Sequence, residues 1–146
     1  MKPRILIVDD EKEFVDSLSE RLTIRGYDVT TALSGEDALK KVKSRNFDVV
    51  ILDVKMPGID GIETLREIKR MKPLTEVIML TGYATVETAI KGMQLGALDY
   101  FMKPYIHEEL VFKINRGCHR KAEHEQRIRW AKASHIMVSP RSALKE

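Results

Sequence analysis

Five short apolar runs recur along the chain, and each stretch between them is long enough for one helix. Within a run the apolar residues are successive rather than alternating, as in Ile5–Val8 and Val49–Leu52. This pattern is typical of parallel strands that are covered on both faces. The five runs are Arg4–Val8, Tyr27–Ala32, Phe47–Leu52, Glu76–Leu80 and Leu98–Met102.

The segments between the runs carry apolar residues at helical spacing, such as Phe14, Leu18 and Leu22 in the first of them. A strand followed by a helix, five times over, predicts an open α/β sandwich with a parallel sheet. A closed eight-stranded barrel needs about 250 residues, whereas this chain has 146. The fold class expected from the pattern is therefore α/β with a single main domain.

Composition narrows the classes of function. The longest unbroken apolar stretches have four residues, far fewer than the roughly 20 of a membrane span. The apolar core of a secretory signal is missing as well, so we expect a cytoplasmic protein without a membrane partner. The single cysteine, Cys118, has no partner for an internal disulfide or a cysteine zinc site.

Charge differs between the two parts of the chain. Residues 1–120 hold 19 basic and 19 acidic residues, and residues 121–146 hold six and three. A neutral main domain does not predict direct nucleic-acid binding by this segment. We expect residues 1–120 to form one domain. Residues 121–146 are expected to be a helical extension and flexible basic tail or linker, with helix to about Ala133 and a flexible end at Ser139–Ser142.

Polar residues follow four of the five predicted strands at their carboxyl ends. In an open parallel sheet, ligands bind outside these ends. Taken singly, each residue could be a cap, a turn residue or a solvated charge, but their joint occurrence at one edge favours a functional site. The residues are Asp9, Asp10, Asp53, Thr81, Gly82 and Lys103.

Three converging carboxylates repel one another unless a cation binds between them. Mg²⁺, with Mn²⁺ as a substitute, prefers such oxygen ligands and often shares them with a phosphate. Thr81 can donate a hydrogen bond to that phosphate and Lys103 can supply a positive charge. The chain has no glycine-rich nucleotide loop, and an aspartate can itself accept a phosphoryl group.

Taken together, these motifs resemble the receiver domain of bacterial two-component response regulators over about residues 3–120. The resemblance implies a flavodoxin-like, doubly wound (βα)5 three-layer sandwich whose five-stranded parallel sheet has the strand order 2-1-3-4-5. The motifs that carry it are Asp9-Asp10, Asp53 with Met56-Pro57, Asp60-Gly61, Leu80-Thr81-Gly82, Tyr100 and Lys103-Pro104.

The resemblance also assigns a role to each residue of the site. It implies that Asp53 accepts a phosphoryl group from a sensor histidine kinase and that the Lys103–Pro104 bond is cis. Mg²⁺ would be held by Asp10, Asp53 and the Lys55 carbonyl, with Asp9 helping through water. The phosphoryl oxygens would be contacted by Thr81, Lys103 and the backbone N–H groups near Lys55 and Gly82.

On the same resemblance, Thr81 and Tyr100 form a switch that changes one face of the domain. This output face comprises Thr85–Leu95, Leu98–Lys103 and His107–Arg120, and we expect it to form a homodimer and to control a downstream effector domain or protein. The stretch Leu80–Ala89 is similar to receivers of ATPase-type transcription activators.

Two other functions compete with this interpretation. One is a stand-alone receiver that regulates a partner protein. The other is a Mg²⁺-dependent phosphatase with an aspartyl-phosphate intermediate. Such a phosphatase usually carries a second aspartate two residues after the first, where this chain has Lys55. We therefore expect a signalling domain rather than a turnover enzyme.

Overall fold

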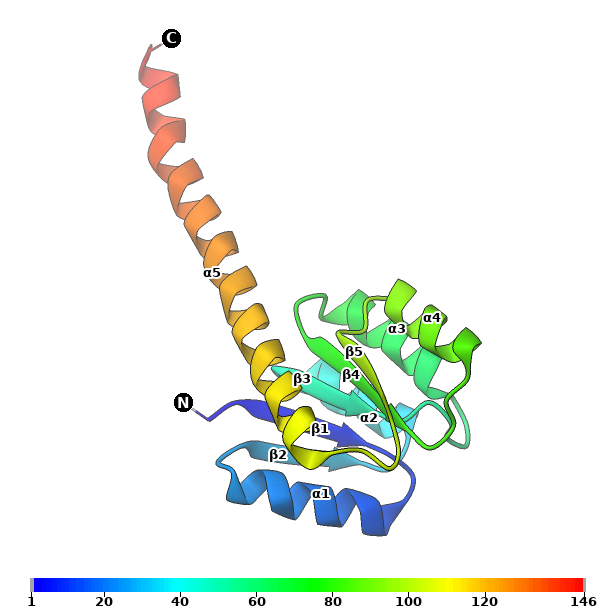
Figure 1. Cartoon of the computed structure of the whole chain (residues 1–146). Helices are drawn as coiled ribbons and strands as arrows, with labels where there is room; N and C mark the ends of the chain where they lie inside the picture. Colours follow the sequence, from blue (N-terminus) through cyan, green and yellow to red (C-terminus); the bar gives the residue numbers. More distant parts are fainter. Residues whose placement is uncertain (1, 146) are drawn as a thin grey trace.

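The computed structural model describes residues 2–145, and the side chains of residues 2–134. Strands and helices alternate along the chain (Figure 1). The strands lie within two residues of their expected bounds. The elements are β1 (Arg4–Val8), α1 (Lys12–Ile24), β2 (Asp28–Ala32), α2 (Gly35–Ser44), β3 (Val49–Leu52), α3 (Gly61–Met71), β4 (Glu76–Thr81), α4 (Val86–Gln94), β5 (Asp99–Met102) and α5 (His107–Lys145).

The strands form one parallel sheet in the order β2-β1-β3-β4-β5, which confirms the predicted order. The register aligns the strand ends, since Val8 lies opposite Leu52 and Thr81 lies opposite Met102. The residues that follow these strands therefore meet at one side of the sheet. We call this side the carboxyl edge, comprising Asp9, Asp10, Asp53, Thr81 and Lys103.

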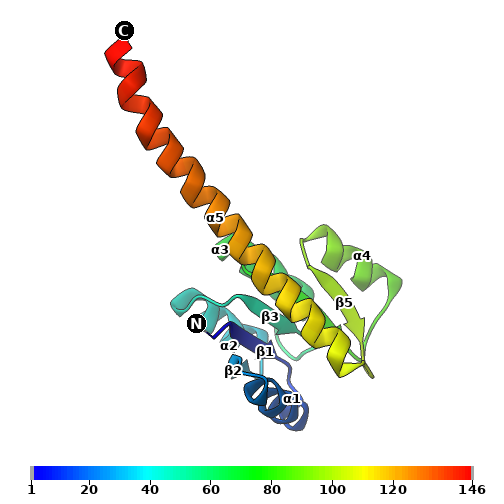
Figure 2. The same cartoon turned by 60° about the vertical axis from the view of Figure 1, so that its left-hand side comes forward.

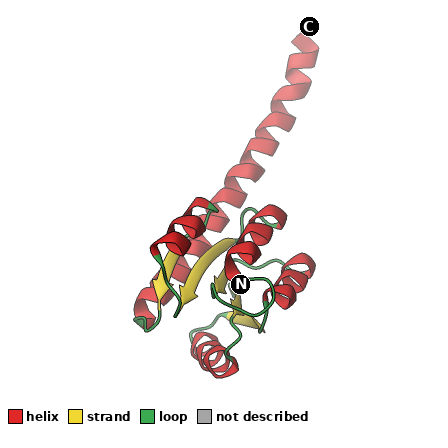
Figure 3. Ribbon diagram, turned by 90° about the vertical axis from the view of Figure 1, so that its right-hand side faces the viewer, coloured by secondary structure: helices red, strands yellow, loops and turns green. Residues whose placement is uncertain are grey.

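Helices cover both faces of the sheet, as Figure 3 shows. Helices α1 and α5 bury one face, with Leu18 and Ile114 among the residues in that core. Helices α2 and α3 cover the other face, with Val42 and Leu65 in the second core. All four residues of β3 are buried, which explains the unbroken apolar run. The three-layer α/β sandwich is thus confirmed.

Helix α5 lies along the sheet and then continues away from it (Figure 2). Two ion pairs hold it where it leaves the sheet: Arg120 Nε lies 3.1 Å from Glu76 Oε2, and Lys121 Nζ lies 3.5 Å from Asp48 Oδ1. The helix continues to Lys145, past the end that we expected near Ala133. The role of residues 121–146 as a linker stays a prediction.

The expected flexible end at Ser139–Ser142 lies inside the helical span. The expectation rests on the Ser139-Pro140-Arg141-Ser142 stretch, whose serines and proline are common in loops. A proline removes one backbone hydrogen-bond donor, and this single loss does not end α5. Among residues 2–145, no helix combines the length and the apolar character that a membrane span requires.

Candidate phosphoryl-acceptor site

Backbone hydrogen bonds carry the sheet one residue beyond its strands at the carboxyl edge. The Asp53 N–H donates to the Val8 carbonyl at 3.0 Å, and the Lys103 N–H donates to the Thr81 carbonyl at 2.8 Å. These residues are therefore held by the rigid sheet, although they lie outside the strands. A site built in this way keeps its side chains in fixed relative positions.

The loop from β3 to α3 folds back tightly against Asp53. The Gly61 N–H donates to the Val54 carbonyl at 2.7 Å, and a Cβ atom at Gly61 would lie only 1.9 Å from the Asp53 carbonyl oxygen. Only glycine fits so close an approach. The preceding Asp60 caps α3, because its side chain accepts from the Glu63 N–H at 2.9 Å. The Asp60-Gly61 motif thus shapes the loop that adjoins Asp53.

Three carboxylates meet at the carboxyl edge. Asp9, Asp10 and Asp53 each place an oxygen within 4.8 Å of the other two. Asp9 and Asp53 are buried, with 1% and 6% of their surface exposed, while Asp10 is exposed. Within residues 2–134, the buried Asp53 Oδ1 atom has no hydrogen-bond partner. Such an atom is rare in folded proteins and is usually met by an ordered water, an ion or a reacting group.

Lys103 approaches the same cluster. Its Nζ atom donates to Asp9 Oδ2 at 2.7 Å and to Glu11 Oε1 at 3.3 Å, and it lies 3.9 Å from the centre of the Phe14 ring. The other Asp9 oxygen accepts from the Glu11 N–H at 2.9 Å, so both Asp9 oxygens are engaged. The Lys103–Pro104 peptide bond is cis.

Sequence reasoning did not select Glu11 or Phe14. Phe14 contributes to the apolar pattern of the first helix, and nothing in that local pattern shows that its ring faces Lys103. The contact joins α1 to the residue after β5. The contact depends on how α1 packs against the sheet, so the sequence pattern alone does not predict it.

Burial dominates the electrostatics of the two buried acids. Burial raises the pKa of Asp53, and the charge of Asp9 adds to this effect, while Thr81 and Lys103 oppose it. Thr81 and the Val54 N–H lower the pKa through hydrogen bonding to the carboxylate, whereas Lys103 lowers it through its charge. Burial likewise raises the pKa of Asp9 despite its hydrogen bond to Lys103. A bound cation would favour the charged carboxylates and so lower both pKa values.

Lys103 responds differently to the same environment. Burial alone lowers the pKa of its ammonium group, but the hydrogen bond to Asp9 and the charges of Asp9 and Asp53 outweigh burial, and the pKa is raised. Lys103 therefore stays charged. The site then holds one fixed positive charge against three carboxylates, which leaves room for a second cation.

The residues present fit a divalent metal ion. A hard cation such as Mg²⁺ binds oxygen ligands and accepts one or two protein carboxylates with a partly open shell. The unpartnered Asp53 Oδ1 and the exposed Asp10 carboxylate offer such oxygens. Asp9 is the least available of the three acids, because Lys103 and the Glu11 N–H already occupy it.

Two loops meet beside the acidic cluster. The buried Thr81 hydroxyl accepts from the Tyr83 N–H at 3.0 Å, which places Gly82 between them in the loop after β4. Lys55, two residues after Asp53, has its Nζ atom 4.7 Å from the centre of the Tyr83 ring. The loops after β3 and β4 are therefore in contact through Lys55 and Tyr83.

Tyr100 is engaged with α4 rather than with Thr81. Its hydroxyl lies 2.8 Å from Thr88 Oγ1, and a Cβ atom at Gly92 would meet the Tyr100 ring at 3.7 Å. The ring is half-buried on this side of the molecule. The structure thus brings the acids, Thr81 and Lys103 together and places Tyr100 against α4.

A family model described as the response regulator receiver domain matches residues 5–115. The chain belongs to this family. It is 44% identical over 113 residues to the transcriptional regulatory protein ZraR of Escherichia coli O157:H7, which covers 77% of this chain and 26% of ZraR. It is 40% identical to the alkaline phosphatase synthesis transcriptional regulatory protein PhoP of Bacillus subtilis, which covers 78% of this chain and 48% of PhoP.

Solved structures show the same receiver fold. A CheY-like receiver domain protein from Methanospirillum hungatei has a TM-score of 0.82 at 32% identity, covering 85% of this chain and 99% of that one. The response regulator TrrA of Thermotoga maritima, in complex with Mg²⁺ and BeF, has a TM-score of 0.73 at 41% identity, covering 80% and 99%. These matches confirm the family that the motifs predicted.

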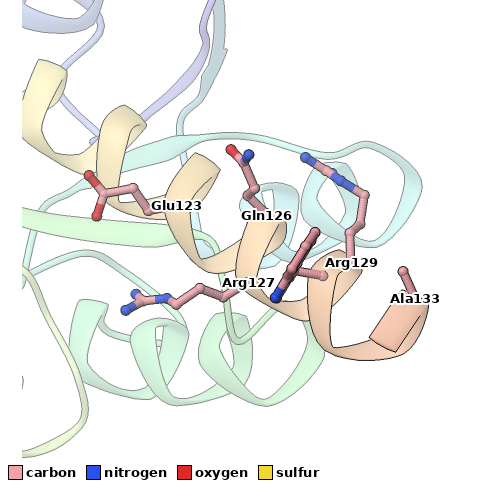
Figure 4. Close-up of a pocket in the computed structure, with 6 residues that line it drawn as sticks. Glu123, Gln126, Arg127, Arg129 and Ala133 are labelled. Atoms are coloured by element: carbon pink, nitrogen blue, oxygen red, sulfur yellow. The ribbon is translucent and has the colours of Figure 1, made fainter. Parts of the chain in front are cut away.

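Beyond the residues that match the receiver family, α5 borders a surface hollow of about 620 Å³ (Figure 4). Helix α5 alone lines it, so no second element closes a site there. The acidic cluster, in contrast, combines residues that follow two different strands, β1 and β3. The lining residues are Glu123, Gln126, Arg127, Arg129, Trp130 and Ala133.

Proposed function

We propose that this receiver domain is a phosphoryl acceptor in which a sensor histidine kinase phosphorylates Asp53. The observation that carries the proposal is the buried Asp53 Oδ1 atom, which has no hydrogen-bond partner within residues 2–134. Leaving a buried acceptor unpaired costs stability, so this arrangement serves a ligand or a reaction better than it serves folding.

The transfer converts a phosphohistidine into an aspartyl phosphate. One carboxylate oxygen of Asp53 forms a bond to phosphorus while the P–N bond of the kinase histidine breaks. The electron pair of that bond stays on the histidine nitrogen, which takes up a proton. A carboxylate nucleophile of this kind is well known in covalent catalysis, and here it makes the domain a substrate of its kinase rather than a turnover enzyme.

Asp10, Asp53 and the Lys55 carbonyl would hold Mg²⁺, or Mn²⁺ in its place, with Asp9 helping through water. The engaged oxygens of Asp9 support this indirect role. When bound, the ion would neutralise negative charge on the phosphoryl oxygens. The likeness to TrrA, whose structure contains Mg²⁺ and BeF, also supports a metal at this edge.

Thr81, Lys103 and the backbone N–H groups near Lys55 and Gly82 would contact the phosphoryl oxygens. Lys103 is charged and already lies beside Asp9, adjacent to Asp53. Donors that are fixed before the reaction stabilise developing charge without reorganisation. This gives each residue of the carboxyl edge a separate task in binding the phosphoryl group.

The proposed switch starts at Thr81 and ends at Tyr100. A phosphoryl group adds about −1.5 to −2 charges and three acceptor oxygens, which would draw the Thr81 hydroxyl away from the Tyr83 N–H. Tyr100 would then exchange its hydrogen bond with Thr88 for the space next to Thr81. The contact between β5 and α4 would change with it.

The output face of α4, β5 and α5 carries exposed apolar side chains that a partner could cover. We propose a homodimer through this face and a downstream effector that acts on transcription in the cytoplasm, with residues 121–146 as the connection. The chain spans about a quarter of ZraR and half of PhoP, both named transcriptional regulators. The exposed side chains are Val86, Ile90, Met93, Met102 and Phe112.

The acceptor chemistry is tested by intact mass after incubation with a small acyl phosphate and Mg²⁺. We expect one phosphoryl adduct that disappears with a chelator and in Asp53→Asn. Asp16→Asn, which removes the same charge from the exposed surface of α1, should still form the adduct. A folded wild-type protein without an adduct under every condition would contradict the proposal.

The proposed dimer is tested by light scattering with and without beryllofluoride and Mg²⁺. We expect the mass to double in the wild type and to stay monomeric in Phe112→Glu. Ile24→Glu, which adds the same charge at an exposed apolar position of α1, should behave as the wild type. An unchanged wild-type mass would remove the dimer from the proposal.

A further inference from the structure

The Lys103 ammonium group rests against an aromatic ring as well as against two carboxylates. The ring belongs to Phe14 in the first turn of α1, and its centre lies 3.9 Å from Lys103 Nζ. The lysine side chain is 16% exposed. A cation over an aromatic face is attracted by the negative charge of that face, and partial burial strengthens the attraction.

Tyr105 holds the Phe14 ring in this orientation. The centres of the two rings lie 6.3 Å apart, and their planes meet at 78°, which is an edge-to-face arrangement. Such pairs are favourable and directional. The face of Phe14 is thereby presented to the ammonium group, and the contact links α1, the residue after β5 and the start of the loop before α5.

A phenyl ring and a carboxylate constrain an ammonium group in different ways. A carboxylate accepts a hydrogen bond in a narrow range of directions, whereas a ring face attracts the charge without accepting a directed hydrogen bond of that kind. At the Phe14 ring, Lys103 can therefore keep one contact while it exchanges hydrogen-bond partners. Asp9 and Asp53, the two acids between which it would move, lie within 4.8 Å of each other.

We propose that Phe14 is a positioning residue that holds the Lys103 ammonium group at the site while it moves from Asp9 toward a phosphoryl group on Asp53. This inference rests on the proposed phosphoryl-acceptor function. Phe14 does not touch the reacting atoms and acts through Lys103. The competing explanation is that Phe14 only fills space between α1 and the loop after β5.

The test compares Phe14→Leu, which keeps an apolar side chain without a ring, with Phe14→Tyr, which keeps the ring. The first readout is the NMR shift of the Lys103 Cε protons, which a ring face displaces upfield. We expect this displacement in the wild type and in Phe14→Tyr, and its loss in Phe14→Leu. This readout reports the contact in the unphosphorylated protein and does not depend on activity.

The second readout is the rate of adduct formation with a small acyl phosphate at saturating Mg²⁺. We expect Phe14→Leu to be slower by about fivefold, the size of one partly buried cation–π contact, and Phe14→Tyr to stay within about twofold of the wild type. Tyr105→Leu, which frees the Phe14 ring, should slow the reaction less. It serves as a second variant with Phe14 intact.

Trp130→Leu is the matched control, because Trp130 is an exposed aromatic residue on α5, outside the residues that match the receiver family model. It should change neither readout. A folded Phe14→Leu that reacts as fast as the wild type, or a Phe14→Tyr as slow as Phe14→Leu, would overturn the positioning role alone. A wild type that forms no adduct, with the Lys103 shift displaced, would show instead that the acceptor function itself had failed.

Discussion

The two ends of the sheet both bury acidic and basic side chains, but they satisfy them differently. The carboxyl edge comprises Asp9, Asp10, Asp53, Thr81 and Lys103. The amino edge, at the opposite end of the strands, comprises Asp48, Lys69, Glu76, Arg120 and Lys121. The charges of the amino edge stabilise the fold, whereas those of the carboxyl edge are available for binding or chemistry.

Both acids of the amino edge, the buried Glu76 and the half-buried Asp48, have partners. Glu76 is 4% exposed, and its two oxygens lie 3.7 Å from Lys69 Nζ and 3.1 Å from Arg120 Nε. Asp48 accepts from the Arg4 N–H at 2.7 Å and pairs with Lys121 at 3.5 Å. Burial lowers the pKa of Lys69, and the charge of Glu76 opposes this. These contacts join α3, β4 and α5.

The carboxyl edge leaves one oxygen of its central acid without a partner. Lys103 neutralises Asp9, but Asp53 Oδ1 has no partner within the described side chains. Burial raises the pKa of both acids. A folded protein tolerates such an arrangement when binding or chemistry requires it, as active sites often show. The lesson is that an unsatisfied buried charge, rather than a buried charge alone, marks the site.

The largest expected effect is at the amino edge. Glu76→Gln removes the charge shared by Lys69 and Arg120 and leaves the buried lysine without its counter-charge, so we expect a loss of about 2 kcal/mol in the free energy of unfolding. Urea unfolding at pH 7 measures it. Adduct formation at Asp53 should be unchanged, and Asp16→Asn should leave the urea midpoint almost where it is. An equally large loss of adduct formation would erase the distinction between the two edges.

A smaller effect of opposite sign is expected at the carboxyl edge. Asp53→Asn removes a buried unpaired charge, so in chelator at pH 7 it should raise the free energy of unfolding by about 1 kcal/mol. The folded-state pKa of Asp53 is raised above its ordinary value of 3.8. The charged carboxylate therefore destabilises the folded protein only as the pH rises through that folded-state pKa.

The increase in the free energy of unfolding of Asp53→Asn should therefore be largest near neutral pH and vanish on acidification toward pH 4. Urea unfolding at several pH values checks this dependence. Adding Mg²⁺ should stabilise the wild type and have little effect on the variant. A variant that is less stable than the wild type in chelator would show that the Asp53 carboxylate has stabilising partners in the folded protein.

The smallest effect is expected for Arg120→Gln. The Arg120 side chain is 57% exposed, and exposed ion pairs contribute little because solvent screens them. Glu76 also keeps Lys69 as a partner. We expect a loss of about 0.5 kcal/mol or less in urea unfolding. A loss as large as that of Glu76→Gln would mean that Arg120, rather than Lys69, carries the stability of the amino edge.

Much of the fold and the site followed from local patterns. Successive apolar residues predicted buried parallel strands, and helical spacing predicted the segments between them, because both patterns reflect neighbours in sequence. A parallel sheet brings the ends of its strands to one edge, so Asp9, Asp53 and Thr81 could be placed together without coordinates. The motifs that include Lys103 and Tyr100 then predicted the family.

The tertiary structure alone decided which charges are satisfied. In sequence, Asp48 and Glu76 lie at the starts of strands and Asp53 follows the end of one, yet only Asp53 keeps a buried oxygen without a partner. The contacts of Lys103 with Asp9 and Phe14, and of Tyr100 with Thr88, join separate elements. Hydrogen bonds and ion pairs depend on distances between such elements, which only their packing on the sheet establishes.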